Sequence, residues 1–207
     1  MKARRPKPGE SRLESKVTRA TSYGTGWVGR SLAYVVVGSF LFALCSPARA
    51  QGEVNSEYRL KLAFLYNFAQ FVQWPADAFR DSGAPLTICV AGDNPFQGDI
   101  QQSLRGRTVA GHPVEVKNLN PHEDLRGCQM IFVRAAEMKA NPGILAGARR
   151  SSTLTVGEAK GFAERGGIIN LMREENKLRF EVNIDAAAQT RLRISSKLLA
   201  LAKIIKE

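Results

Sequence analysis

The sequence contains few of the residue types that enzymes most often place at their reactive centres. Histidine occurs twice in 207 residues, as His112 and His122, and cysteine occurs three times. His112 lies between Gly111 and Pro113, and His122 follows a proline in a polar stretch, so we interpret both as solvated loop residues. No Gly-x-Ser-x-Gly, His-Glu-x-x-His, Cys-x-x-Cys or phosphate-loop motif occurs. We therefore expect no catalytic residue, no metal site and no cofactor.

The sequence also lacks an apolar run of the roughly 20 residues that a membrane-spanning helix needs. An uncharged apolar stretch from Leu32 to Cys45 follows a basic region and precedes the small-x-small sequence at 48–50. This order is typical of a secretory signal peptide, whose apolar part is about 7 to 15 residues long. We predict that residues 1–50 are a signal peptide cleaved after Ala50 and that residues 51–207 form one periplasmic domain. An uncleaved signal anchor is the alternative.

An acidic excess is absent as well, and the basic excess is concentrated near the N-terminus. The first 50 residues hold nine of the 30 lysines and arginines and two of the 19 acidic residues, so they carry +7 of the formal net charge of +11. Because we expect this segment to be removed, the high net charge does not support a nucleic-acid-binding role. The remaining 157 residues have the ordinary length of a single domain.

Two cysteines remain after the predicted cleavage, because Cys45 leaves with the leader. Cys89 and Cys128 each lie in a strand-like apolar run. An even number of cysteines in an oxidising compartment favours a disulfide, which would close a loop of about 40 residues and stabilise the fold by about 3 to 4 kcal/mol. The bridge requires that the two strands be neighbours, and two free buried thiols are the alternative.

The strongest helical pattern runs from Glu57 to Trp74 and is followed by Pro75. Its apolar side chains cover an arc of about 200°, which is wider than the ~100° stripe of an ordinary surface helix. We therefore expect this helix to be wedged between two layers of the fold or to be shared with a partner. The apolar residues form two adjacent stripes, which are Tyr58, Leu62, Leu65, Ala69 and Val72, and Leu60, Phe64, Phe68 and Phe71.

The rest of the chain alternates strand-like and helix-like patterns, which predicts an α/β sandwich around a largely parallel sheet. Residues 167–172 and 177–183 form a predicted hairpin around a polar turn, and residues 185–206 are predicted to be helical. The other predicted elements are strands at 85–92, 106–119 (two pieces), 128–134 and 151–156, and short helices through Ile100 and Leu104, after Pro142 and at 160–165.

Four blocks of sequence between residues 62 and 199 carry a resemblance. They are LAFLYNFAQFVQWP at 62–75, ICVAGDNPF at 88–96, LTVG at 154–157 with GFA at 161–163 and GG at 166–167, and RFEVN at 179–183 followed by SSKLL at 195–199. In this order the blocks resemble the YfiR-like periplasmic family, and they span nearly all of the predicted mature chain.

The resemblance implies a three-layer α/β/α sandwich, with a shape like one lobe of a periplasmic binding protein and without catalytic activity. It also implies a repressor that binds the periplasmic sensor portion of an inner-membrane GGDEF-domain diguanylate cyclase, lowering cyclic di-GMP and biofilm formation. An OmpA-like outer-membrane lipoprotein would sequester this repressor. Cys89 and Cys128 match a cysteine pair of the family, whereas Ala163 and Asn170 occupy the positions of a second pair, so a second, redox-sensitive bridge is not expected.

One hypothesis of function is a protein-interaction module, which we expect to form a homodimer. The observation that supports this hypothesis is the wide apolar arc of the first helix, since large apolar patches mark interaction sites. The candidate partner-binding residues are Phe64, Phe68, Phe71 and Glu181. For Glu181, a merely solvated position on a strand is the alternative.

A second hypothesis is a small-ligand sensor that partners another signalling protein or an outer-membrane receptor. Ligands of open α/β sheets bind at the carboxyl ends of the strands. The candidate ligand-binding residues are Arg193, Ser195 and Ser196, because an arginine can hold a carboxylate through two hydrogen bonds. The alternative is that Ser195 caps a helix and that Arg193 only precedes it.

Overall fold

The computed structural model describes residues 49–96, 98–120 and 123–206, with side chains from Ser56 onward. The predicted signal peptide therefore lies outside the described residues except at its last two positions, and so do Cys45 and His122. Residues Ala48–Glu207 form one unit, which is described by itself. Among its described residues, no helix is both long and apolar enough to cross a bilayer.

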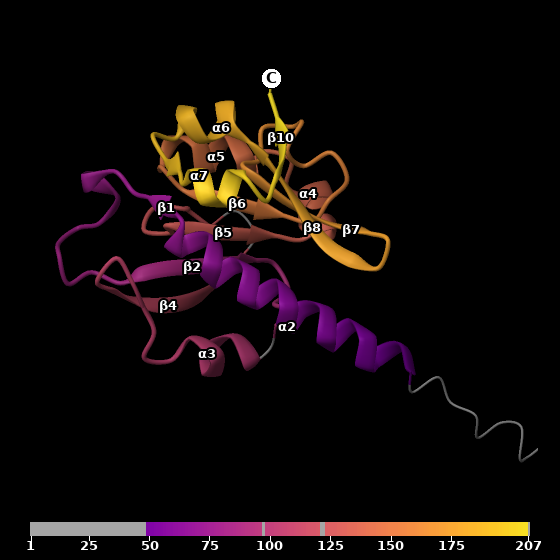
Figure 1. Cartoon of the computed structure of the whole chain (residues 1–207). Helices are drawn as coiled ribbons and strands as arrows, with labels where there is room; N and C mark the ends of the chain where they lie inside the picture. Colours follow the sequence, from indigo (N-terminus) through magenta and orange to yellow (C-terminus); the bar gives the residue numbers. More distant parts are fainter. Residues whose placement is uncertain (1–48, 97, 121–122, 207) are drawn as a thin grey trace, which may run out of the picture. The chain divides into compact units, whose positions relative to one another are not determined.

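The centre of the fold is a mixed, largely parallel sheet (Figure 1). Its strands are β2 (Leu86–Ala91), β3 (Thr108–Val109), β4 (His112–Leu119), β5 (Met130–Val133), β6 (Leu154–Gly157), β7 (Ile169–Glu174), β8 (Lys177–Asn183) and β10 (Lys203–Ile205). They lie in the order β10-β8-β7-β6-β5-β2-β4-β3. The five strands from β4 to β7 are parallel, β8 returns antiparallel to β7, and β10 runs parallel to β8.

Helices cover both faces of this sheet, which makes the fold a three-layer α/β/α sandwich, as the family resemblance implies. Figure 1 shows the longest of them, α2 (Arg49–Gln70), lying against one face of the sheet. The core on the side of α2 also includes side chains of α3 (Asp99–Leu104), α6 (Ile184–Gln189) and α7 (Ser196–Leu199). The second core lies under α4 (Ala135–Ala140) and α5 (Ile144–Arg150).

The central strands are apolar along their whole length because each contributes to both cores. In β2, Ile88 and Val90 belong to the core on the side of α2, whereas Cys89 and Ala91 belong to the core under α4 and α5. Successive side chains of a strand point to opposite faces, so a strand covered on both faces reads as a continuous apolar run. This is why the sequence predicted β2, β5 and β6 close to their observed bounds.

The first helix ends four residues earlier than predicted, at Gln70 instead of Trp74. Val72 and Gln73 form a short strand, β1, which pairs antiparallel with β9 (Arg193–Ile194). The backbone N–H of Ser195 also donates to the carbonyl of Phe71 at 2.9 Å. The sequence prediction failed here because the partner that ends the helix lies about 120 residues away in the chain.

Two other predicted helices are wrong. Residues 185–206 do not form one helix but α6, β9, α7 and β10 in succession, and Leu201 of the predicted apolar side is 74% exposed. Arg191 interrupts the helical path with a φ of 60°, and the chain then pairs with β1 and β8. Residues 160–165 form turns, and α4 was not predicted.

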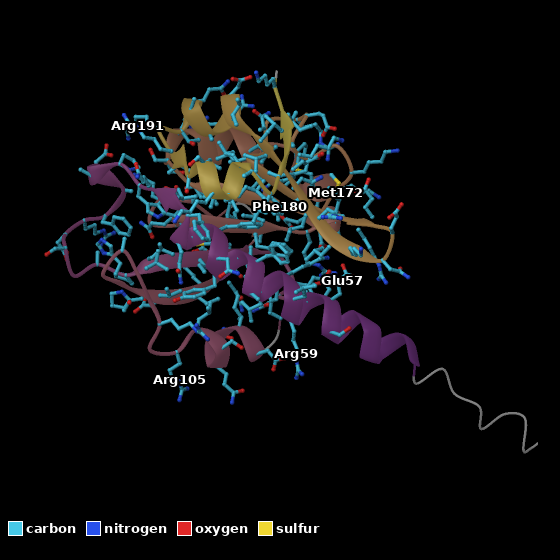
Figure 2. All side chains as sticks on the ribbon, viewed as in Figure 1. Glu57, Arg59, Arg105, Met172, Phe180 and Arg191 are labelled. Atoms are coloured by element: carbon cyan, nitrogen blue, oxygen red, sulfur yellow. A yellow bond between two sulfur atoms is a disulfide. The ribbon has the colours of Figure 1, made fainter. Side chains whose placement is uncertain are left out.

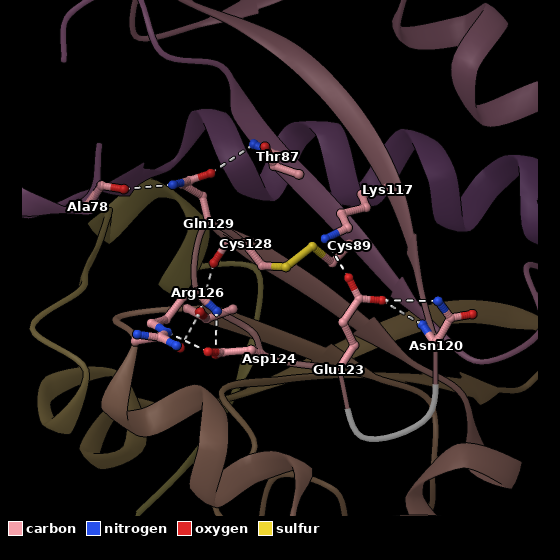
Figure 3. The surroundings of a disulfide bond; sticks show 12 residues. Ala78, Thr87, Cys89, Lys117, Asn120, Glu123, Asp124, Arg126, Cys128 and Gln129 are labelled. Atoms are coloured by element: carbon pink, nitrogen blue, oxygen red, sulfur yellow. Dashed lines mark hydrogen bonds and ion pairs between the residues drawn. A yellow bond between two sulfur atoms is a disulfide. The ribbon is translucent and has the colours of Figure 1, made fainter. Parts of the chain in front are cut away.

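Cys89 and Cys128 form a disulfide within the second core, so the predicted bridge is confirmed (Figure 3). Their Cα atoms are 5.8 Å apart, because β2 and β5 are neighbours and Cys128 lies two residues before β5. His112 begins β4 and is not a solvated turn residue: its ring stacks on Phe79 at 3.7 Å, and its Nδ1 lies 2.7 Å from the carbonyl oxygen of Ala84.

Candidate functional site

A charged pocket of about 570 Å³ lies where β6 ends, between the middle of α2 and the strands β7, β8 and β10. Its ionisable lining balances four carboxylates against four cations. The carboxylates are Glu57, Glu158, Glu164 and Glu181, and the cations are Lys61, Lys160, Arg173 and Lys203. Carboxyl ends of parallel strands are the usual place for ligands in open α/β sheets, and this pocket occupies one such place.

One wall of the charged pocket is a row of residues that run across the sheet in register. Gly157 of β6 pairs with Asn170 of β7, Asn170 pairs with Glu181 of β8, and Glu181 pairs with Lys203 of β10. The side-chain amide of Asn170 donates to Glu181 Oε1 at 3.0 Å, and Lys203 Nζ lies 3.8 Å from Glu181 Oε2. Among the described residues, Asn170 Oδ1 is buried without a hydrogen-bond partner. A buried acceptor without a donor is energetically costly.

The opposite wall is built around Lys61 of α2, which is only 5% exposed. Its ammonium group lies 2.5 Å from Glu57 Oε1 and 2.7 Å from Glu158 Oε2. Tyr58 donates its hydroxyl to Glu158 Oε1 at 3.2 Å, and the Lys61 ammonium lies 4.6 Å from the centre of the Tyr58 ring. This cluster ties the middle of α2 to the carboxyl end of β6.

Both titratable donors of this cluster have a raised pKa. Burial is the largest single influence and lowers the pKa of Lys61, but the hydrogen bonds from its ammonium group to Glu158 and Glu57, together with the negative charges of these carboxylates, raise the pKa above its ordinary value. The pKa of Tyr58 is raised by burial and by the negative charge of Glu158. Lys61 therefore stays charged and Tyr58 stays neutral at physiological pH.

Five apolar side chains in or beside α2 and β10 are exposed or half-buried, and we call them together the α2–β10 surface. It consists of Leu60, Phe64, Phe71, Leu201 and Ile204. Leu60, Phe64 and Phe71 follow each other at the spacing of one helical stripe. Ile204 is in register with the core residue Val182, so its side chain points to the face of the sheet on which α2 lies. Phe64 is half-buried and packs on Phe180, with ring centres 6.0 Å apart.

The structure divides the candidate partner-binding residues into two groups. Phe71 is exposed and Phe64 is partly exposed, so both offer surface to another molecule. Phe68 is 1% exposed in the core and offers none, because its ring packs between Phe64 and Phe180. Glu181 is 2% exposed, so it is not a solvated strand residue; a molecule would reach it only through the charged pocket.

The candidate ligand-binding residues do not line this pocket. Arg193 is exposed in β9, and Ser195 accepts a hydrogen bond from the backbone N–H of Lys197 at 3.3 Å, so it caps α7. Ser196 is the first residue of α7 and is exposed. The expected crevice at the carboxyl ends of the strands exists, but other residues form it. The alternative stated for these residues is the one that the structure shows, because Ser195 caps a helix and Arg193 precedes it.

Sequence reasoning did not identify Lys61 or Asn170 as site residues. A signal for Lys61 was present, because it lies three residues after Tyr58 and four before Leu65 and therefore falls on the buried stripe of the helix. A lysine on such a stripe must find an acidic partner. Within the described residues, no group of three or more His, Cys, Asp and Glu side chains is placed to hold a metal ion.

Comparison with known proteins identifies a family. The YfiR/HmsC-like family matches residues 58–203, which include every strand of the main sheet except the last two residues of β10, and every residue that lines the charged pocket except Glu57. No curated protein matches the chain. A solved structure, described as a conserved domain protein from Vibrio cholerae O1 biovar El Tor strain N16961, is similar with a TM-score of 0.43 and 16% identity. The similarity covers 58% of this chain and 54% of the Vibrio chain.

Proposed function

This chain belongs to the YfiR/HmsC-like family, and from that premise we propose that it is a periplasmic regulator of cyclic di-GMP signalling. In this proposal it binds the periplasmic portion of an inner-membrane diguanylate cyclase and represses it, which lowers cyclic di-GMP and biofilm formation. The protein performs no chemistry of its own. Its regulatory effect comes from the free energy of binding, which favours the inactive state of the cyclase.

The observation that carries this proposal is the α2–β10 surface. Leu60, Phe71, Leu201 and Ile204 are the large hydrophobic side chains that the described part of the chain exposes. Large apolar side chains left exposed to solvent are candidates for an interface with a partner, because large exposed apolar patches mark interaction sites. The strand β10 adds an open edge, because it pairs with β8 on one side only. Apolar side chains beside an open strand edge suit a protein partner better than a small molecule.

The test is capture of a candidate cyclase by variants that place a carboxylate on this surface. Leu201→Asp is the first choice because Leu201 is 74% exposed and has no role in the core; Phe71→Asp is the second. Burying a carboxylate in an apolar interface costs several kcal/mol, so we expect co-purification with the cyclase to weaken at least about 10-fold and cellular cyclic di-GMP to rise.

Gln101→Asp, on the exposed side of α3, is the matched control and should behave as the wild type. Phe64→Asp is less informative, because Phe64 also packs on Phe68 and Phe180 and its change would disturb the fold. If Leu201→Asp and Phe71→Asp both fold normally and repress fully, the α2–β10 surface is not where the cyclase binds.

The OmpA-like outer-membrane lipoprotein and the homodimer belong to the same proposal. Relief of repression requires that the lipoprotein and the cyclase exclude each other, which follows if both cover the α2–β10 surface. The lipoprotein should therefore displace the cyclase in a competition experiment, and Leu201→Asp should weaken both complexes. A lipoprotein that binds this variant as tightly as the wild type would contact a different surface.

A second candidate function, a small-ligand sensor, is favoured by the unpaired Oδ1 atom of Asn170 in the charged pocket. Carboxylates and cations line the same pocket, so a zwitterion such as an amino acid matches its charges. Thermal unfolding in the presence of amino acids and nucleotides separates the two functions. Stabilisation that disappears in Asn170→Ala, without capture of a cyclase, would favour the sensor.

A further inference from the structure

A second concave site lies at the opposite ends of the strands, where the chain enters the sheet. It is a groove of about 610 Å³ lined by residues that precede β2, β5 and β6, among them Pro85, Gln129 and Ser152. Figure 2 shows Arg191, which lines this groove, at the side of the molecule away from Glu57 of the charged pocket. The groove is therefore separate from the site described above.

Arginine dominates the charges of this groove. Arg80 follows the short helix η1 (Ala76–Ala78), Arg126 lies before β5, Arg150 ends α5 and Arg191 follows α6. Asp77 is the one acidic residue that lines the groove in the described part of the chain. We call this site the arginine groove, and its four guanidinium groups come from four separate segments of the chain.

Two of these arginines have acidic partners and two do not. Arg191 donates to Asp77 Oδ2 at 2.9 Å and to Ser152 Oγ at 3.1 Å, and Arg126 pairs with Asp124 (Figure 3). Within the described residues, the guanidinium groups of Arg80 and Arg150 have no ion-pair or hydrogen-bond partner. The groove therefore keeps a positive surplus that the protein itself does not neutralise.

The floor of the arginine groove is held rigidly. Gln129 donates its side-chain amide to the carbonyl of Ala78 at 2.6 Å and accepts the backbone N–H of Thr87 at 2.9 Å (Figure 3). Next to Gln129, the backbone carbonyl of Cys128 accepts a hydrogen bond from the hydroxyl of Thr153. The side chain of Cys128 forms the disulfide with Cys89. These bonds fix η1, β2 and β5 relative to one another. A rigid floor lowers the entropy that binding would otherwise cost.

We propose that the arginine groove binds phosphate groups, either of a soluble phosphorylated molecule or of lipid headgroups. The planar guanidinium group of arginine donates two parallel hydrogen bonds to a phosphate, and four of them in one groove suit a ligand with more than one negative charge. The volume of the groove lies in the range of small-molecule sites. This binding is independent of the cyclase-binding function proposed above.

The test is calorimetric titration of the purified protein with inorganic pyrophosphate. We expect the double variant Arg80→Gln/Arg150→Gln to bind about 100-fold more weakly than the wild type, at about 10-fold for each charge-assisted contact. Arg105→Gln is the matched control for each of the single variants Arg80→Gln and Arg150→Gln, because Arg105 is exposed at the end of α3, away from the groove (Figure 2), and its loss removes the same single charge. This control should bind within about 2-fold of the wild type.

Vesicles distinguish the two sources of phosphate. If lipid headgroups are the ligand, sedimentation with phosphatidylglycerol vesicles should exceed sedimentation with phosphatidylcholine vesicles and should depend on Arg80 and Arg150. If the ligand is soluble, only the binding of pyrophosphate should depend on these two arginines. The proposal is overturned if neither probe shows this dependence or if Arg105→Gln weakens binding equally. Tighter binding of citrate than of pyrophosphate would also overturn it, because the groove would then select carboxylates.

Discussion

At the residue scale, Lys61 is a buried cation whose contribution to the stability of the fold depends on its acidic partners. Removing one member of a buried ion pair leaves the other charged and desolvated, which costs about 3 to 5 kcal/mol. Glu158 would be left in this way, whereas Glu57 is partly exposed and would be solvated by water. We therefore expect Lys61→Ala to lower the free energy of unfolding by about 3 kcal/mol in urea denaturation.

Lys160→Ala is the control for this prediction, because Lys160 lines the same pocket but is exposed, and it should change stability by less than about 0.5 kcal/mol. The double variant Lys61→Met/Glu158→Gln should recover much of the loss, since both buried charges are gone. If Lys61→Ala is as stable as the wild type, the cluster does not hold α2 on the sheet.

The raised pKa values of Lys61 and Tyr58 predict a loss of stability in alkaline solution. For Lys61, the stabilisation is complete below the unfolded-state pKa of about 10.4 and is lost as the pH rises through the higher folded-state pKa. For Tyr58, the unfolded chain ionises at a lower pH than the folded chain, which also favours unfolding as the pH rises. The free energy of unfolding should therefore fall above about pH 10.

Urea denaturation at several pH values between 8 and 11.5 would measure this fall. The variant Tyr58→Phe/Lys61→Met lacks both groups, so its stability should depend less on pH over the same range. An equal fall in the wild type and in the variant would assign the effect to other residues.

At the scale of elements, the turn after β6 depends on a close contact between glycines and an aromatic ring. A Cβ atom on Gly157 would lie 2.4 Å from the ring of Phe162, which is buried in the second core. We expect Gly157→Ala to lower the free energy of unfolding by about 2 kcal/mol through overpacking. Gly98→Ala, where a Cβ atom would meet no other atom within 4 Å, is the matched control and should cost nothing.

The contact between Gly157 and Phe162 can be isolated with a double-mutant cycle measured in urea. Phe162→Leu removes part of the ring, so the combination with Gly157→Ala should be less destabilising than the sum of the two single changes. Strict additivity would show that the alanine methyl group and the ring do not meet. The GFA sequence at 161–163 and the glycine at position 157, which carried the family resemblance, thus have a packing reason.

The disulfide is the other feature that joins elements, because it links β2 to the segment before β5. Its two cysteines are 39 residues apart, so reduction should lower the free energy of unfolding by about 3 to 4 kcal/mol. Equilibrium denaturation with and without dithiothreitol measures this effect. The stability of the variant Cys89→Ala/Cys128→Ala should not change with the reductant. If the stability of the wild type does not change either, the bridge does not contribute to stability.

At the scale of the whole molecule, the arginine groove is built from other elements than the charged pocket and the α2–β10 surface, which share α2 and β10. Changes at the groove and at the apolar surface should therefore act independently. We expect Leu201→Asp to lose the cyclase and keep wild-type affinity for pyrophosphate, whereas Arg80→Gln/Arg150→Gln should keep the cyclase and lose pyrophosphate. A variant that loses both while remaining folded would show that the two surfaces are coupled.

Much of the fold was predictable from the sequence because its central elements carry their own signals. Strands covered on both faces, such as β2 and β5, are continuous apolar runs, and the hairpin β7–β8 has a polar turn between two strand-like segments. The periodicity of the first helix identified the buried side chains Leu62, Leu65 and Ala69. These patterns depend on residues that are close in sequence, so they can be recognised without knowledge of the tertiary structure.

The tertiary structure alone decided where α2 ends, how the last 20 residues fold and which side chains form the sites. β1, β9 and β10 are two or three residues long, which is too short to show an alternation of apolar and polar residues. Each forms because it pairs with a strand that is not its neighbour in the sequence. Lys61 meets Glu158 across 97 residues, and Arg191 meets Asp77 across 114. The sequence thus determined the layers of the protein, because burial leaves a local pattern, whereas the sites arose only where the folded chain brought distant charges together.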